Sequence, residues 1–118
     1  MPPKEPSDAL PTHWFHILLA LADEPRHGLG ITEEAASRSA GEAQLWPGML
    51  YIALRRMTGS GLIVETEPPA DFNAGGGRPR FYRLTPAGRR ALSAEAERLA
   101  RLVDAARAKR VIKRAKPV

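Results

Sequence analysis

The chain has 118 residues, a formal net charge of +5 and no cysteine. A chain of this length forms one domain and leaves much of its surface exposed, so an oligomer interface would add stability. The lack of cysteine excludes disulfides and thiolate metal sites and fits a reducing compartment. The longest strongly apolar stretch, residues 17–22, is too short to span a bilayer, and the N-terminus lacks a secretory pattern. We therefore expect a cytoplasmic protein with no membrane partner.

Positive charge is concentrated in two segments. Six basic residues and no acidic residue follow Ala106, which leaves a net charge of −1 for residues 1–106. Residues 78–90 also lack an acidic residue but contain five arginines, namely Arg78, Arg80, Arg83, Arg89 and Arg90. Such segregation suits the binding of a polyanion. A genome that favours arginine would explain the number of these residues but not their clustering.

The first half of the chain shows helical patterns. Residues 1–8 are rich in proline and predict a disordered lead. The next apolar residues recur at helical spacing and predict a first helix: Leu10, Trp14, Ile17, Leu18 and Leu21. Phe15 and Leu19 widen its apolar face beyond what a small core needs, which predicts contact with a second subunit. Residues 23–28 break this helix, and a second helix is predicted over residues 31–40.

A third helix should begin near Pro47, because proline is favoured in a first helical turn, and should end before residues 60–61. One face is predicted to pack inward, with Leu50, Ala53, Leu54 and Met57. The remaining arc is predicted to be exposed, with Gly48, Tyr51, Ile52, Arg55, Arg56 and Gly59.

Residues 62–67 and 80–84 favour strands and predict a hairpin with a long glycine-rich loop that ends at Arg78. A loop tip of this kind beside two arginines is typical of a DNA-binding wing, where it contacts phosphate. The alternative is a disordered surface loop whose arginines only keep it soluble.

Thr85 and Pro86 predict the start of a last helix that extends beyond Arg107. An apolar stripe runs along it, with Leu92, Ala96, Leu99, Val103 and Ala106, and Glu95 and Arg98 are placed outside this stripe. Its spacing resembles two heptads of a coiled coil, which favours a dimer helix. An ordinary amphipathic helix packed on its own domain is the alternative.

These elements predict a mainly α protein with a small β-hairpin. A winged helix-turn-helix would occupy residues 9–88, a dimerisation helix residues 89–108 and a basic tail residues 109–118. The tail is interpreted either as a frayed helix end or as an additional electrostatic contact with DNA.

Four motifs in this order resemble the PadR-like family of bacterial transcriptional regulators: HGLGI (27–31), GMLYIALRRM (48–57), GLI (61–63) and GRPRFYRLTPAG (77–88). The resemblance covers roughly residues 14–105 and is closest to short members with a single C-terminal helix. The resemblance implies a homodimeric transcription factor, usually a repressor, that binds double-stranded DNA. It also implies that a small molecule weakens this binding. Three positions depart from the family pattern. Trp46 stands where the family commonly has a small polar helix cap, and Ile52 where proline or a polar residue is frequent. Residues 58–60 replace a usual acidic run.

The predicted DNA-binding residues are Gly48, Tyr51, Arg55, Arg56, Arg78 and Arg80. Arg55 is expected to read guanine, and Arg56 to meet phosphate or an acidic neighbour. Arg78 and Arg80 are expected to reach the flanking backbone or the minor groove. Tyr51 is interpreted either as a base contact or as a ring packed under the first helix. The predicted dimerisation residues are Trp14, Leu18, Leu92, Leu99 and Val103. A pocket for a small aromatic effector is predicted beside Trp14 and Phe15.

Catalysis is not expected. The three histidines, His13, His16 and His27, lack a carboxylate at ligand spacing, and the glycine-rich segment precedes a strand instead of following one. We therefore predict no metal and no cofactor. The remaining alternative is a winged-helix module that binds another protein and not DNA.

Overall fold

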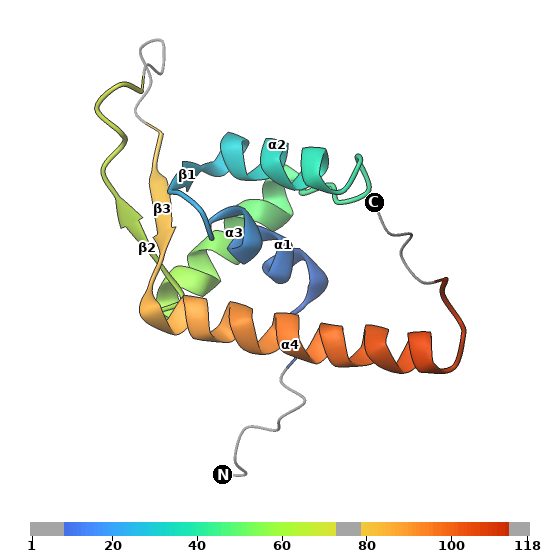
Figure 1. Ribbon diagram of the computed structural model, residues 1–118. Helices are drawn as coiled ribbons and strands as arrows, with labels where there is room; N and C mark the ends of the chain where they lie inside the picture. The colour runs from blue at the N-terminus through green and yellow to red at the C-terminus, as the bar shows by residue number, and fades with distance from the viewer. Residues whose placement is uncertain (1–8, 73–78, 114–118) are drawn as a thin grey trace.

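The computed structural model describes residues 9–72 and 79–113. Within these ranges it contains four helices and three short strands, arranged as shown in Figure 1. In chain order they are α1 (Thr12–Ala20), β1 (Arg26–His27), α2 (Gly28–Arg38), α3 (Pro47–Gly59), β2 (Ile63–Thr66), β3 (Phe81–Leu84) and α4 (Pro86–Ala108). The predicted architecture, a mainly α protein with a small β-hairpin, is confirmed.

The core lies between α1, α2, α3 and the start of the hairpin. Its largest fully buried side chains are Ile17, Leu18, Ile31, Leu54, Met57 and Ile63. The inward face predicted for α3 is confirmed, since all four of its apolar residues are buried. Trp14 and Phe15 of α1 are half-buried and pack against this core.

The sheet has one strand more than the sequence predicted. β3 is its central strand, and it pairs antiparallel with both β1 and β2. The segment before α2 was predicted only to break a helix, but Arg26 and His27 pair with Tyr82 and Phe81. Two residues are too few for an alternating pattern, so this strand had no sequence signal. As a result α2 begins at Gly28, three residues before the predicted start at residue 31.

The start of α4 is fixed to the base of the hairpin. The Thr85 hydroxyl accepts a hydrogen bond from the Gly88 backbone N–H at 3.0 Å, which confirms the predicted N-cap. The Thr85 N–H donates to the Leu62 carbonyl at 3.1 Å. Gly88 packs so tightly on Leu62 that a Cβ at this position would lie 2.9 Å from the Leu62 carbonyl carbon. The direction of α4 is therefore set by the hairpin.

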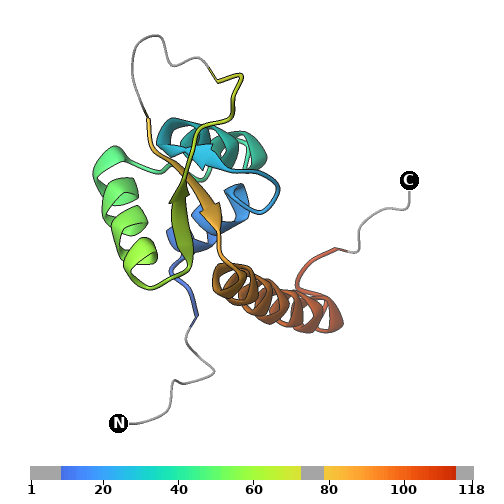
Figure 2. The same ribbon diagram turned by 90° about the vertical axis from the view of Figure 1, so that its left-hand side faces the viewer.

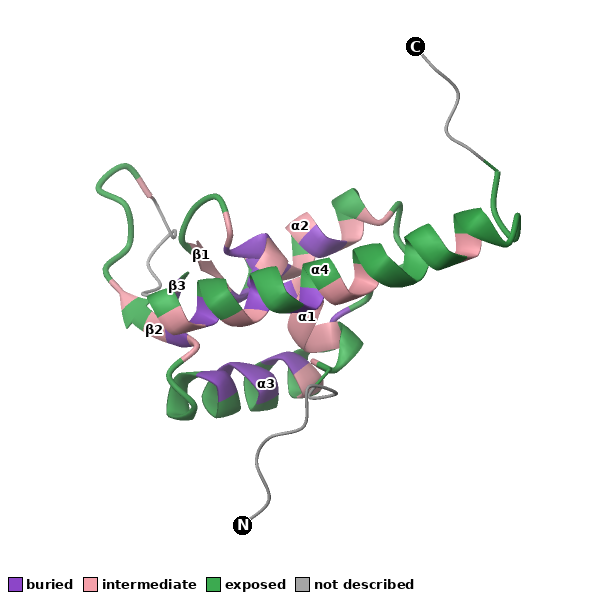
Figure 3. Ribbon diagram, turned by 60° about the horizontal axis from the view of Figure 1, so that its bottom comes forward, coloured by how far each residue is buried: buried purple, intermediate pink, exposed green. Residues whose placement is uncertain are grey.

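The two halves of α4 have different surroundings. Its first half packs along α1, whereas its outer half extends past the body of the molecule (Figure 1) and is almost entirely exposed (Figure 3). Leu102 and Val103 in the outer half are 56% and 39% exposed, and Leu99 is half-buried.

The burial corrects the predicted positions of three residues, namely the predicted dimerisation residues Leu18 and Leu92 and the residue Glu95. Leu18 is 0% and Leu92 only 6% exposed, so both side chains belong to the core of the single chain and leave no surface for a second subunit. Glu95 was placed outside the stripe, yet it is 6% exposed. Its carboxylate is paired with Arg98 at 2.6 Å, and this hydrogen bond holds the pKa of Glu95 below its usual value. The first half of α4 thus packs on its own domain, as the alternative interpretation proposed.

Candidate nucleic-acid interface

The outward arc of α3 carries the side chains predicted to read DNA. α3 begins at Pro47, and the N-cap position before it is Trp46, whose side chain makes no capping hydrogen bond. Tyr51 and Ile52 are 57% and 53% exposed. The exposure of Tyr51 contradicts the interpretation that its ring packs under the first helix.

The arginines of this region are available for a partner. Arg55, Arg56 and Arg80 are exposed. The ion pairs among the described residues involve Arg26, Arg38, Arg98 and Arg107, and none of them includes Arg55, Arg56 or Arg80. A charged side chain that has no carboxylate partner within the described chain retains its capacity to bind phosphate or a base edge.

α3 and the hairpin lie side by side (Figure 2). Residues from both elements line a hollow. This hollow has a volume of about 300 Å³ and is lined by Tyr51, Leu54, Arg55, Thr58, Glu65, Arg80 and Tyr82. It therefore brings together three of the predicted DNA-binding residues, Tyr51 and Arg55 from α3 and Arg80 from the hairpin. Glu65 adds one negative charge to this surface.

The other predicted contacts have different positions. Gly48 is exposed in the first turn of α3, and nothing lies within 4 Å of the place where a Cβ would be. Arg56 lies further round the same helix. Arg78 lies outside the described residues, as does most of the glycine-rich loop tip.

Aromatic rings anchor the base of the long loop. The His27 ring stacks on Phe81 with centroids 5.1 Å apart, and Phe72 meets Phe81 edge-on at 4.8 Å. Sequence reasoning missed this cluster because the contacts join β1, β3 and the loop, which are far apart in the chain. The cluster fixes where the loop leaves and re-enters the sheet.

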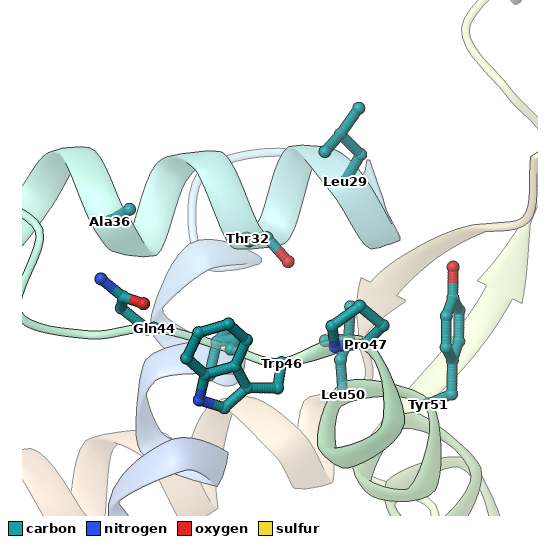
Figure 4. Close-up of a pocket in the computed structure, with 9 residues that line it drawn as sticks. Leu29, Thr32, Ala36, Gln44, Trp46, Pro47, Leu50 and Tyr51 are labelled. Atoms are coloured by element: carbon teal, nitrogen blue, oxygen red, sulfur yellow. The ribbon is translucent and has the colours of Figure 1, made fainter.

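A second missed feature is a cavity between α2 and the start of α3, drawn in Figure 4. Its volume is about 350 Å³, and its lining is Leu29, Thr32, Ala36, Gln44, Leu45, Trp46, Pro47, Leu50 and Tyr51. Trp14 and Phe15, the residues predicted to form an effector pocket, are not part of it. The departure of Trp46 from the family pattern was the one sequence signal for this site.

A polar network connects α1 to α2. The Arg38 guanidinium donates to the His16 carbonyl at 3.2 Å, lies 3.1 Å from His16 Nδ1 and pairs with Glu34 at 2.9 Å. Burial, followed by the charge of Arg38, lowers the pKa of His16. Within residues 9–72 and 79–113, no group of three histidine, aspartate or glutamate side chains is placed to hold a metal ion. In the same ranges, no helix has both the length and the apolar character needed to cross a membrane.

A helix with an exposed arc beside a hairpin, followed by a long outer helix, defines a winged helix-turn-helix protein. The model of the transcriptional regulator PadR-like family matches residues 17–94, which is more than half of the chain. The chain therefore belongs to this family, and the resemblance drawn from its four motifs is confirmed. Because the family is one of transcriptional regulators, the prediction that the chain is not an enzyme is confirmed as well.

Individual proteins and a solved structure are also similar to this chain. A transcriptional regulator of Mycobacterium tuberculosis is 37% identical over 88 residues, covering 75% of this chain and 76% of the relative. An uncharacterised 37.1 kDa protein in transposon TN4556 of Streptomyces fradiae is 42% identical over 86 residues, which is 73% of this chain. The chain spans only 22% of that protein's length. The structure of Bacillus subtilis PadR in complex with operator DNA matches with a TM-score of 0.60 and 18% identity, covering 92% of this chain and 50% of that one.

Proposed function

We propose that this protein is a sequence-specific DNA-binding transcriptional regulator that acts as a homodimer. α3 enters the major groove of the operator, and the hairpin with its loop forms the wing that contacts the flanking backbone or minor groove. Arg55 reads guanine, Tyr51 contacts a base or the groove wall, and Arg56 and Arg80 bind phosphate. Arg78, which lies outside the described residues, is proposed to act with Arg80.

The hollow between α3 and the hairpin is the observation that supports this proposal most strongly. It unites Tyr51, Arg55 and Arg80 on one face, although Arg80 is 25 positions after Arg55 in the chain. All three are exposed or half-exposed, and neither arginine pairs with a described carboxylate. DNA supplies the two kinds of partner that such a surface needs, namely phosphates for orientation and base edges for specificity.

The outer half of α4 supports the homodimer. Leu99, Leu102 and Val103 form an apolar surface that the single chain leaves largely uncovered. A second copy of α4 packed along it would bury this surface. Two symmetry-related α3 helices would then read a pseudo-palindrome whose half-sites are centred about 10 base pairs apart, or a multiple of that spacing.

The proposal extends to repression and to release by an effector. A dimer bound over a promoter would block transcription. Because regulators of this kind often control their own genes, the DNA upstream of the gene for this protein is the first candidate operator. A small aromatic effector is proposed to bind at the subunit interface beside Trp14 and Phe15, because both rings are only half-buried in the single chain.

The experiment begins with the selection of tight duplexes from a random library. Affinities for the best duplex and for a scrambled duplex are then compared by fluorescence anisotropy at near-physiological salt, for wild type and Arg55→Ala. We expect Arg55→Ala to lose about 1–3 kcal/mol of sequence preference while it retains weak binding to both duplexes.

Arg101→Ala is the matched control, since it removes the same charge from an exposed position on α4. This variant should keep the full sequence preference. Equal preference in wild type and Arg55→Ala would refute the role of Arg55. If wild type binds no duplex at all, the protein-interaction alternative is favoured.

A further inference from the structure

Two groups of large apolar side chains are exposed on the described part of the chain. One group lies on the outer half of α4 and just beyond it. The other lies around the start of α3 and consists of Leu29, Trp46, Tyr51 and Ile52, with exposed fractions of 60%, 66%, 57% and 53%. We call this second group the apolar patch. The proposed dimer gives a use to Leu102 and Val103 of the first group but leaves the apolar patch unexplained.

The apolar patch is continuous with the surface proposed to face DNA. Tyr51 lines the hollow that contains Arg55 and Arg80, and it also lines a second hollow with Leu29 and Arg80. On its other side Tyr51 lines the cavity with Leu29 and Trp46. Figure 4 shows Trp46 and Tyr51 on either side of Pro47, with Leu29 projecting from the start of α2. A partner that contacts the arginines therefore also meets the patch.

Ile52 connects the patch to the positions of α3 that are proposed to face DNA. It lies four residues after Gly48 and three before Arg55, so the three positions share one face of α3. Ile52 is not among the residues that line the cavity beside Trp46. A ligand confined to that cavity would leave Ile52 uncovered, whereas a DNA major groove that receives α3 would cover both Trp46 and Ile52.

Two residues at the start of α3, on either side of Pro47, stabilise the helix less than other residue types would. Trp46 occupies the N-cap position, where a short polar side chain would satisfy a free backbone N–H. Gly48 occupies the first turn, although no atom beyond its chain neighbours and the backbone of its own helix lies within 4 Å of the place where a Cβ would be. Departures from local rules without a compensating contact mark functional positions. Glycine here permits close approach of a partner, and tryptophan supplies an apolar surface beside it.

We propose that Trp46 and Ile52 recognise the C5-methyl groups of thymine in the major groove, next to the base contact made by Arg55. This inference rests on the DNA-binding function proposed above. The thymine methyl is the apolar group that a base pair presents in the major groove, and an apolar side chain recognises it by burying it from water. The operator should then contain thymine under the N-terminal half of α3 in each half-site.

The test removes single methyl groups from DNA. In the tightest duplex recovered from the random library, each thymidine is replaced in turn by deoxyuridine, which lacks only the C5-methyl, and affinity is measured by anisotropy. Wild type should lose affinity about fourfold at one or more thymines of each half-site, the factor that corresponds to one buried methyl-sized group. Ile52→Ser and Trp46→Ser should each bind the thymine and uracil duplexes equally at one of these positions.

Two further variants control for non-specific effects. Ile52→Val keeps a branched apolar side chain and should keep most of the methyl dependence. Val111→Ser removes an apolar side chain that is 72% exposed beyond the C-terminal end of α4. This variant should keep the full methyl dependence. Circular dichroism should show all variants folded, because each substituted side chain is largely exposed.

Four results would overturn the inference. Wild-type affinity that is unchanged by uracil at every position would show that no methyl is read. Serine variants with the wild-type dependence on the thymine methyl would show that other residues read this methyl. In both cases, a retained preference for the selected duplex over scrambled DNA leaves the proposed function intact. Unchanged uracil binding, together with saturable binding of 8-anilinonaphthalene-1-sulfonate that Trp46→Ser abolishes, would assign the patch to a small aromatic ligand. Equal wild-type binding to the selected and scrambled duplexes would remove both the inference and the proposed function.

Discussion

Replacement of Gly88 by alanine should destabilise the fold by about 2 kcal/mol. The new Cβ would overlap the Leu62 carbonyl oxygen and lie 2.9 Å and 3.3 Å from the carbonyl carbon and Cα of Leu62. These are backbone atoms, so no side-chain rotation relieves the overlap. The same carbonyl oxygen accepts the Thr85 N–H at 3.1 Å, and the Leu62 N–H donates to Met57 at 3.0 Å. Leu62 is therefore held from both sides.

The magnitude follows from three contributions. Overpacking of a tight site costs about 1–3 kcal/mol. Loss of the hydrogen bond to Thr85, if α4 moves away, costs about 1 kcal/mol more. The better helix propensity of alanine returns up to about 1 kcal/mol. The net loss should lower the melting temperature by about 8–16 °C, at about 4–8 °C per kcal/mol for a domain of this size.

The assay is thermal unfolding followed by far-ultraviolet circular dichroism at one fixed protein concentration, because the proposed dimer would make stability depend on concentration. Gly59→Ala is the control, since it lies at the end of α3 with nothing within 4 Å of the added Cβ. This control should melt at or slightly above the wild-type temperature. A Gly88→Ala protein as stable as wild type would refute the packing of α4 on Leu62.

Four further predictions concern stability, pH, assembly and DNA. Gly48→Ala should raise stability by at most about 1 kcal/mol in thermal unfolding, yet weaken operator binding in anisotropy, because nothing in the chain but a closely approaching partner opposes the added Cβ. The pKa of His16 is lowered in the folded state by burial and by Arg38, so the unfolded chain binds a proton first as pH falls. The free energy of unfolding should therefore decrease as pH drops below 6.5 and stop decreasing below the folded-state pKa of His16. Urea unfolding at several pH values should show a weaker decrease for His16→Gln than for wild type. An identical decrease would contradict the role of His16 in this pH dependence. Leu102→Asp, at a site 56% exposed in the single chain, should shift the sedimentation coefficient towards monomer while the protein stays folded, whereas an unchanged coefficient would remove Leu102 from the interface. Truncation after Ala106 should reduce the slope of log affinity against log salt concentration by about 0.9 for each phosphate that the tail neutralises in the full chain. An unchanged slope would show that the tail is only a frayed helix end.

The sequence predicted those parts of the fold that have a local signature. The inward face of α3 was predicted from spacing alone, and the start of α4 from a threonine followed by proline. Both signals lie within a few neighbouring residues. β1 had no such signature, because a two-residue strand exists only through its pairing with β3.

The candidate site was predicted only in part, because local spacing does not show which distant segments come together. Helical spacing identified the exposed arc that contains Tyr51 and Arg55, but it did not bring Arg80 beside them, which requires the hairpin to fold against α3. Leu18 and Leu92 were assigned to a dimer because an apolar stripe does not reveal which partner covers it. Burial of Glu95 was missed because a charged residue is usually exposed unless it is paired, and its partner Arg98 was itself placed on the surface.

Recognition of DNA by α3 is tested most directly by the affinity of wild type and Arg55→Ala for a selected duplex and its scrambled counterpart at near-physiological salt. We expect a strong wild-type preference for the selected duplex, and this preference should fall by about 5- to 150-fold in the variant, the factor that corresponds to about 1–3 kcal/mol. A wild-type protein that binds both duplexes equally would contradict sequence-specific recognition by α3.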